Sequence, residues 1–402
     1  MEKKNQIPKY PPLRFPEFTD EWKEVKLGEV AHFSGGGTPS SEYSSYWEGT
    51  IPWISSSDIQ KNNVTQINVT RFITKEALQH SSTKLCKAPC VLVVSRVGVG
   101  KVAYSDIDIC TSQDFCILTD IQCEYHFLSY YLLTVMEKKV REVQGTSIKG
   151  ITVQEVKSFP LRLPSLAEQR KIAALLSLID ERIEVQNAII KEQEALKASL
   201  LRRLFDRTLR FPEFTDEWKV VRLGEVAEII GGGTPSTTTT NYWNGGIVWF
   251  NPSEIGKKKY VSNSNRTISH QGLSNSGARL LPKGTVLLTT RATIGEIAIA
   301  NVECTTNQGF QSVITGCEAN NEYVYYFLST QKEYLLRHSS GSTFRETPPS
   351  VIRNLPLHLP SLPEQRKIAA LLSAVDERLA VERAYAKQLK QQKAYLLRQI
   401  FI

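Results

Sequence analysis

The longest regular pattern of apolar residues runs from Ser165 to Phe205 and predicts one continuous helix. This stretch contains neither glycine nor proline and is rich in residues that favour helices. Ser165 followed by Glu168 is the pattern of a capping box, in which the two side chains bond reciprocally to backbone N–H groups. Apolar residues at steps of three and four predict a seam against another helix, interrupted by Gln186, Gln193 and Lys197. The seam residues are Ile172, Leu176, Ile179, Ile183, Ile190, Leu200 and Leu204.

A second copy of this stretch begins at Ser361, 196 residues further on, and again has Glu364 three residues after the serine. A helix of this length spans on the order of 60 Å and cannot bury an apolar stripe by itself. We therefore expect the two helices to pack antiparallel as a coiled coil, with pseudo-two-fold symmetry between the copies. The second seam, with Glu382 and Lys393 as polar interruptions, consists of Ile368, Leu372, Val375, Leu379, Ala386, Leu389, Leu396 and Ile400.

The rest of the chain is duplicated as well. RFPEFTDEWKEVKLGEVAHFSGGGTPS (14–40) returns with few changes at 210–236, and SRVGVGKVA (95–103) aligns with TRATIGEIA (290–298). Each copy mixes short β-branched runs, typical of strands, with one amphipathic helical stretch before the long helix. The predicted fold class is therefore α+β, with two similar mixed α/β domains, each followed by a long helix. The polar loops diverge between the copies, which suggests two sites of one geometry that recognise different features.

Composition narrows the possible functions only modestly. The net charge of +8 and the pI near 9.0 fit a polyanionic partner. No apolar run reaches the length of a membrane span, and the first residues do not form a signal peptide. Seven cysteines without a CxxC pair are expected to be reduced thiols in the cytoplasm, with a zinc site as the alternative.

Taken together, the doubled RFPEF…W…LGE, GGGTPS, arginine–glycine turn, TxQxF and LPSLxEQRKIAALL motifs resemble the DNA-sequence specificity subunit of type I restriction-modification systems. The resemblance covers essentially the whole chain. It implies a tail (1–13), two target recognition domains (14–162 and 210–358) and two repeat helices (163–209 and 359–402) that act as spacer and docking surface.

The resemblance also implies a DNA-binding function and a set of partner subunits. Each recognition domain would read one half of an asymmetric, split sequence in double-stranded DNA. Two methyltransferase subunits and the restriction subunits would join the complex in the cytoplasm. No catalytic residue, metal or cofactor is expected in this chain, and S-adenosylmethionine, Mg and ATP are expected on the partner subunits only.

Arginines before glycine-containing turns are the first candidates for DNA contact, namely Arg96 and Arg291, because a guanidinium binds guanine or phosphate in bidentate fashion. The polar loops after a shared tryptophan could read base edges, and helix capping is the equal alternative for these residue types. These loop candidates are Ser55, Ser56, Ser57 and Asp58 in the first copy and Asn251, Ser253 and Glu254 in the second.

Further candidates lie in matched loops. Glutamine can pair with adenine, backbone N–H groups of the GGGTPS loops can bind phosphate, and cations near the linkers can position it. For each the alternative is an ordinary structural or solvated residue, as it is for the lysine run 257–259. The candidates are Gln113 and Gln308, Gly36 and Thr38, Gly232 and Thr234, and Lys149 and Arg345.

The identical helix starts favour more than an intramolecular coiled coil, because two like partners need two like surfaces. The candidate docking residues are Gln169, Arg170 and Lys171 with their copies Gln365, Arg366 and Lys367.

Two other function classes compete with DNA recognition. An enzyme acting on DNA would need motifs that are absent: Asn251-Pro252-Ser253 fails as a methyltransferase motif, Gly100-Lys101 lacks the rest of a P-loop, and the Glu21-Trp22-Lys23 triplet lacks its nuclease partner. A structural adaptor that binds only protein is the other class, and neither the isolated chain nor its complex would then bind DNA.

Overall fold

The computed structural model describes residues 10–143, 150–341 and 345–401. The chain forms two compact units: Met1–Ile189 with Arg383–Ile402, and Ile190–Glu382. Each unit contains one globular domain together with portions of both long helices. The units therefore do not coincide with the tandem copies, because each takes a helical segment from the other copy.

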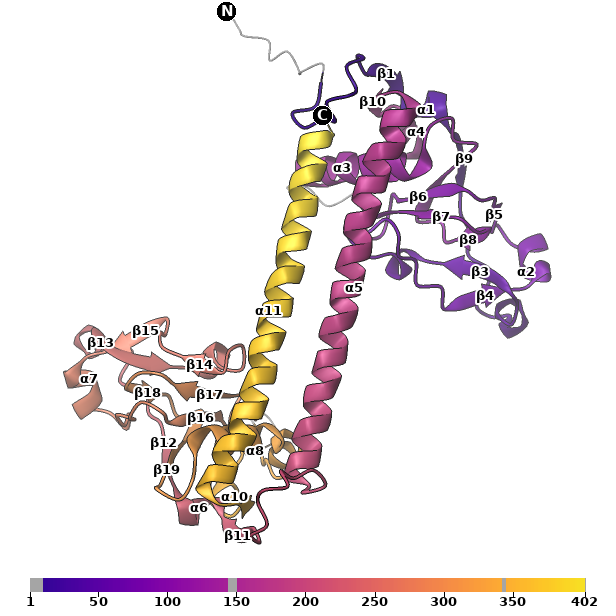
Figure 1. Ribbon diagram of the computed structural model, residues 1–402. Helices are drawn as coiled ribbons and strands as arrows, with labels where there is room; N and C mark the ends of the chain where they lie inside the picture. The colour runs from indigo at the N-terminus through magenta and orange to yellow at the C-terminus, as the bar shows by residue number, and fades with distance from the viewer. Residues whose placement is uncertain (1–9, 144–149, 342–344, 402) are drawn as a thin grey trace, which may run out of the picture. The chain divides into compact units, whose positions relative to one another are not determined.

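The first unit contains three sheets (Figure 1). Their strands are β1 (Lys23–Lys26), β2 (His32–Gly35), β3 (Ile51–Ile54), β4 (Arg71–Ile73), β5 (Leu85–Cys86), β6 (Cys90–Val94), β7 (Val102–Ser105), β8 (Ile109–Thr111), β9 (Phe115–Thr119) and β10 (Pro160–Leu163). One sheet is antiparallel in the order β2-β9-β6-β7, and the second has the order β4-β3-β8-β5 with a parallel β3–β8 pair. β1 and β10 form a separate antiparallel pair.

The helices of this domain are α1 (Leu27–Val30), α2 (Lys75–Gln79), α3 (Tyr125–Val143) and α4 (Val153–Lys157). Both faces of β6 are buried, which explains its unbroken apolar sequence. Val91 and Val93 pack in the core that includes α3, whereas Leu92 and Val94 pack in the core toward the second sheet. The domain therefore has a central sheet with an apolar layer on each side.

The second unit repeats this plan. Its strands are β11 (Lys219–Arg222), β12 (Ala227–Gly231), β13 (Trp243–Phe250), β14 (Tyr260–Val261), β15 (Arg266–Ile268), β16 (Val286–Thr289), β17 (Ile297–Ala300), β18 (Cys304–Thr306), β19 (Phe310–Thr315) and β20 (Pro356–Leu359). The sheets have the orders β12-β19-β16-β17-β14, β15-β13-β18 and β11-β20. The helices are α6 (Leu223–Val226), α7 (His270–Ser274), α8 (Asn321–Ser329), α9 (Lys332–Arg337) and α10 (Pro349–Arg353).

One difference concerns the amphipathic helix. In the first domain it is continuous as α3, whereas in the second it is divided into α8 and α9. The hydroxyls of Ser329 and Thr330 bond to the carbonyl oxygens of Tyr326 and Phe327 at the break. These bonds occupy carbonyl oxygens at the end of α8, where Thr330 is the C-cap.

The two predicted long helices are confirmed as α5 (Leu166–Phe205) and α11 (Leu362–Ile400). In the first unit, Ile172 shares a core with Ile400, and Ile183 shares one with Leu389. The numbers rise along one helix as they fall along the other, so these segments are antiparallel. In the second unit Leu204 likewise packs with Ile368.

Candidate nucleic-acid interface

The GGGTPS loops are held tightly against the strand ends. A Cβ on Gly36 would lie 2.2 Å from the carbonyl oxygen of Ser112, and one on Gly232 would lie 2.1 Å from that of Asn307. The next N–H of each loop, on Gly37 and Gly233, donates to the carbonyl oxygen of Thr111 or Thr306. The glycines are thus required by close backbone packing, which is the structural alternative that the sequence left open.

The loop threonines and the candidate glutamines meet on the surface in both domains. Thr38 donates its hydroxyl to Gln113 Oε1 at 2.6 Å, and Thr234 makes the equivalent bond to Gln308 at 2.5 Å. All four side chains are exposed. The sequence-predicted loops therefore converge in each domain, and each glutamine amide group remains available as a donor.

In the first domain Arg96 joins this surface. An open hollow of about 670 Å³ is lined by Gly36, Arg96, Gln113 and the segment 150–153. Arg96 is exposed, and Lys101 Nζ, from the same turn, donates to the carbonyl oxygen of Ser56 at 2.7 Å. Backbone groups, glutamine and arginine thus gather on one face of this domain.

The predicted polar loop 55–58 is internally bonded. Asp58 accepts from the N–H of Ser55 at 2.7 Å, which is the capping arrangement, and it also forms an ion pair with Arg71. Burial raises the pKa of Asp58, but the bonds from the Ser55 N–H and Arg71 outweigh it and lower the pKa below its usual value. Ser56 is buried, and Ser55 and Asp58 hold the loop together. Base contact by this loop stays a prediction.

The equivalent loop of the second domain has the same cap with other residues. Glu254 accepts from the N–H and the side-chain amide of Asn251, and the Asn251 Oδ1 accepts from the N–H and hydroxyl of Ser253. The amide of Asn251 is thus engaged locally, and Ser253 is exposed. Capping explains this sequence pattern, and DNA contact by these residues stays a prediction.

Two arginines that the sequence reasoning missed lie beside these loops. Arg71 packs over the ring of Trp53 at 4.5 Å, and Arg266 packs over that of Trp243 at 3.5 Å. They lie 195 residues apart, as do the arginines of the 95–103 and 290–298 repeat. A search for basic residues at repeat-related positions would have found them.

Among the remaining candidates, Lys149 lies outside the described residues, and Arg345 is exposed. Lys259, which the sequence suggested as a surface cation, is mostly buried and pairs with Glu322 at 3.0 Å. It also donates to Ser373 of α11. This lysine therefore fixes the loop to the helix and is not a solvated charge.

The docking prediction needs correction at both glutamines. Gln169 is buried, accepts from the N–H of Glu124 and donates to the carbonyl oxygen of Pro164. Gln365 is buried and makes equivalent bonds to Asn320 and Pro360. Both glutamines tie the helix start to the domain and cannot form an outer surface. The other four candidates are exposed, namely Arg170, Lys171, Arg366 and Lys367, although Lys171 pairs with Glu17 and Lys367 with Glu213.

The helix-capping glutamates have a second role that the sequence did not reveal. Glu168 does provide a backbone N–H to the Ser165 hydroxyl, at 3.4 Å, but its buried carboxylate binds Arg14 in bidentate fashion at 2.8 Å. Trp22 donates to the same carboxylate. Arg210, Trp218 and Glu364 repeat this arrangement. The repeated RFPEF…W motif therefore anchors each domain to the start of its helix.

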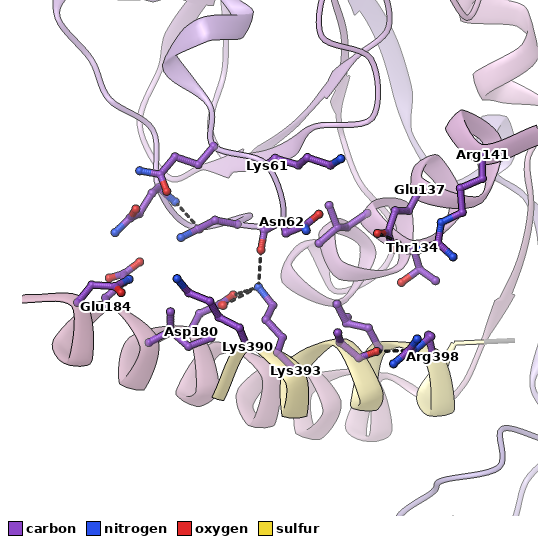
Figure 2. A pocket seen from close by; sticks show the side chains of 18 residues that line it. Lys61, Asn62, Thr134, Glu137, Arg141, Asp180, Glu184, Lys390, Lys393 and Arg398 are labelled. Carbon is purple, nitrogen blue, oxygen red and sulfur yellow. Dashed lines mark hydrogen bonds and ion pairs between the residues drawn. The ribbon is translucent and has the colours of Figure 1, made fainter. Parts of the chain in front are cut away.

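A further buried cluster joins the helices within the first unit (Figure 2). Lys393 of α11 forms an ion pair with Asp180 of α5 at 2.5 Å, and it donates to the carbonyl oxygen of Asn62. Tyr130 of α3 donates to Asp180 at 2.8 Å. Burial raises the pKa of Asp180 and lowers that of Lys393. The polar interruption at Lys393, visible in the sequence, is thus a specific contact.

The cysteines of the described residues are all free thiols. Burial raises the pKa of Cys86, Cys90 and Cys116 to about 12, so these thiols are protonated near neutral pH. Within residues 10–143, 150–341 and 345–401, no group of three or more His, Cys, Asp or Glu side chains could hold a metal ion. In the same ranges, every helix is too short or too polar to cross a membrane.

The fold and the paired polar faces define a protein with two related recognition domains on a helical scaffold. A family model, the type I restriction modification DNA specificity domain, matches residues 19–195 and again residues 215–391. The chain therefore belongs to this family. The two matches are related by the same 196-residue shift as the sequence repeat.

Known relatives agree with this assignment. The chain is 40% identical over 165 residues to the type I restriction enzyme MjaIX specificity subunit of Methanocaldococcus jannaschii, covering 40% of this chain and 38% of that relative. It is 25% identical to the EcoR124I/EcoR124II specificity subunit of Escherichia coli, over 61% of this chain and 62% of the relative. The crystal structure of a type I S subunit from M. genitalium shares the fold, with a TM-score of 0.61, 16% identity and coverage of 98% and 99%. All three relatives are described as specificity or S subunits.

Proposed function

We propose that this chain is the non-catalytic specificity subunit of a type I restriction-modification complex and that it binds an asymmetric, bipartite DNA sequence. Each domain reads one half-site. The observation that carries this proposal is the doubled polar face, with Thr38–Gln113 in one domain and Thr234–Gln308 in the other, beside loops of different sequence.

The chemistry of this face suits double-stranded DNA. Arginine and glutamine are the side chains that read guanine and adenine in the major groove, and the excess of positive charge favours the phosphate backbone. The helices set the distance between the half-sites and recruit two methyltransferase subunits, which a restriction subunit joins. S-adenosylmethionine, Mg and ATP are bound by those partners, and the complex acts in the cytoplasm.

Single-molecule methylome sequencing tests this proposal directly. Cells that carry this gene with a methyltransferase partner should show a methylated split motif that is absent from a deletion strain. Replacing residues 14–160 with the corresponding domain of another family member should change one half of the motif only. A motif that is unaffected by deletion of the gene would contradict the proposal.

The spacer role has its own test. Deleting one heptad from both long helices should shorten the gap between the half-sites and leave the half-sites unchanged, because a heptad contributes about 10 Å of helix. An unchanged gap would show that the helices do not set the spacing.

A further inference from the structure

The segment that precedes α4 or α10 runs beside the candidate arginine in both domains. The N–H of Ile151 donates to the carbonyl oxygen of Ser95 at 2.7 Å, and the N–H of Thr347 donates to that of Thr290 at 3.0 Å. These two bonds join equivalent residues of the repeat. The residues one position earlier, Gly150 and Glu346, therefore occupy the same place next to Arg96 and Arg291.

The two domains differ sharply at this place. Glu346 forms an ion pair with Arg291, with 2.8 Å between Oε2 and Nη2, and the two residues also form an isolated β-bridge. Arg96 faces Gly150 instead, and within the described part of the chain no carboxylate pairs with it. The guanidinium of Arg96 thus carries an unopposed charge, whereas that of Arg291 is locally neutralised.

The backbone of the first domain excludes the same arrangement. A Cβ on Gly150 would lie 2.8 Å from the carbonyl oxygen of Ser95 and 3.2 Å from Cγ of Arg96. A glutamate cannot be placed there without a backbone shift. The difference between the domains is therefore a property of their backbones as well as of one side chain.

A carboxylate beside Arg291 affects two kinds of DNA contact in different ways. A phosphate approaching Arg291 meets the negative charge of Glu346 as well as the positive charge of the guanidinium, so the net attraction is small. The O6 and N7 atoms of guanine are neutral acceptors and are not repelled in this way. With Nη2 held by Glu346 and Nε buried without a partner among the described residues, the remaining free edge of the guanidinium is Nη1.

We propose that Glu346 is a specificity-determining residue of the second domain, because it restrains Arg291 from binding phosphate and reserves it for a base edge. The first domain has no such restraint, and Arg96 binds phosphate with its full charge. This inference rests on the proposed function, since it concerns how the same surface discriminates among DNA sequences.

The test compares Glu346→Gln with the natural sequence in the full chain assembled with its partner subunits. The probe is mixed-sequence double-stranded DNA, titrated over a range of salt concentrations. Removing the charge of Glu346 should raise the affinity about threefold at low salt, the size of an exposed ion pair, and steepen the salt dependence by about one phosphate contact. Methylome sequencing of the variant should show a more degenerate second half-site and an unchanged first one.

Three further variants make the result decisive. In an Arg291→Gln background, Glu346→Gln should have no effect, because the glutamate acts through that arginine. Glu303→Gln removes an exposed charge from the same unit and should not reproduce the change in the second half-site. Arg96→Gln should lower the affinity for mixed-sequence DNA more than Arg291→Gln does.

Equal salt dependence of Glu346→Gln and the natural sequence would overturn the inference, as would an effect that persists in the Arg291→Gln background. Thermal unfolding of each variant checks that the Thr347–Thr290 pairing and the domain remain folded. If the natural complex itself showed no salt-dependent binding, the proposed function would fail first. The two failures are therefore distinguishable.

Discussion

The two units contain the same polar cluster in two different environments. Tyr130, Asp180 and Lys393 in the first unit correspond by the 196-residue shift to Tyr326, Asp376 and Lys197 in the second. In both clusters the tyrosine hydroxyl donates to the aspartate carboxylate at 2.8 Å. The lysine Nζ lies 2.5 Å from the same carboxylate. The lysine and aspartate side chains are 6% and 4% exposed in the first unit but 27% and 23% exposed in the second.

The difference comes from the loops that pack on the cluster. In the first unit the loop at Asn62 covers Lys393 and accepts a bond from it through a backbone carbonyl. In the second unit the equivalent loop supplies a second cation, Lys259, which binds Ser373 and Glu322 and leaves the Lys197 pair more open. The repeat thus provides the same connections twice, while the diverged loops decide how deeply each one is buried.

The largest expected effect comes from breaking the buried pair. Asp180→Ala should destabilise the first unit by about 3–5 kcal/mol, because it leaves the Lys393 ammonium buried without its partner. Asp376→Ala should cost about 1 kcal/mol in the second unit, because solvent screens the more exposed Lys197. Hydrogen exchange measured separately on the amides of α3 and α8 gives the local free energy of opening in each unit.

A double replacement checks the cause. Asp180→Leu combined with Lys393→Met should recover most of the stability that Asp180→Ala loses, since an apolar pair needs no charge compensation. Equal losses for Asp180→Ala and Asp376→Ala would show that burial is not what separates the two clusters.

The next effect should be the same in both units. Glu168→Ala and Glu364→Ala each remove a buried carboxylate that binds an arginine and a tryptophan, Arg14 with Trp22 or Arg210 with Trp218. Each should lower the free energy of unfolding by about 1.5–3 kcal/mol, the range for hydrogen bonds to charged groups. Urea unfolding followed by tryptophan fluorescence measures both. A difference larger than about 1 kcal/mol between the two variants would contradict the equivalence of these anchors.

The features that the sequence predicted are those that repeat periodically along the chain. The long helices α5 and α11 and the β-branched strands follow from the spacing of apolar residues, and the duplication follows from comparing the two halves of the chain. All three are confirmed. The partner of Lys393 was not predictable, because Asp180 lies 213 residues away and no periodicity joins them. Lys393 was visible only as an interruption of the apolar seam.

Only part of the candidate site could be predicted, because only its repeated residues are visible in the sequence. Matched glycines, glutamines and arginines stand out in the repeat alignment, and several of them do meet on one face. Burial is a tertiary property, so Gln169 and Ser56 could not be recognised as interior residues from their type. Arg71 could have been found as a basic residue that is repeated at Arg266, but its contacts with Trp53 and Asp58 could not be predicted from the sequence.

A smaller effect tests the loop of the second unit. Lys259→Met should destabilise this unit by about 1 kcal/mol, because it removes the pair with Glu322 and the bond to Ser373 while retaining the apolar stem. The equivalent replacement in the first unit, Asn63→Ala, removes only the local bonds to the Thr65 and Gln66 N–H groups and the Thr65 hydroxyl. Hydrogen exchange of residues 257–262 and of the helix near Ser373 should increase in Lys259→Met alone. Unchanged exchange near Ser373 would show that this lysine does not hold the loop on α11.

The smallest effect is a pH dependence that belongs to the second unit. Burial raises the pKa of Glu322, but the hydrogen bonds from Tyr260 and Lys259 outweigh it and hold the pKa below 4.5. Because the folded-state pKa is lowered relative to the unfolded one, this carboxylate stabilises the unit fully above the unfolded pKa and loses its contribution as the pH falls through the folded pKa. The difference in melting temperature between the natural protein and Glu322→Gln should therefore be constant near neutral pH and shrink in the acid range, as the pH falls through the folded pKa of Glu322. A difference that stays constant into the acid range would mean that the charge of Glu322 is not what binds Lys259. If Glu322→Gln also changed the hydrogen-exchange rates of amides in the first unit, the effect would not be local to this loop.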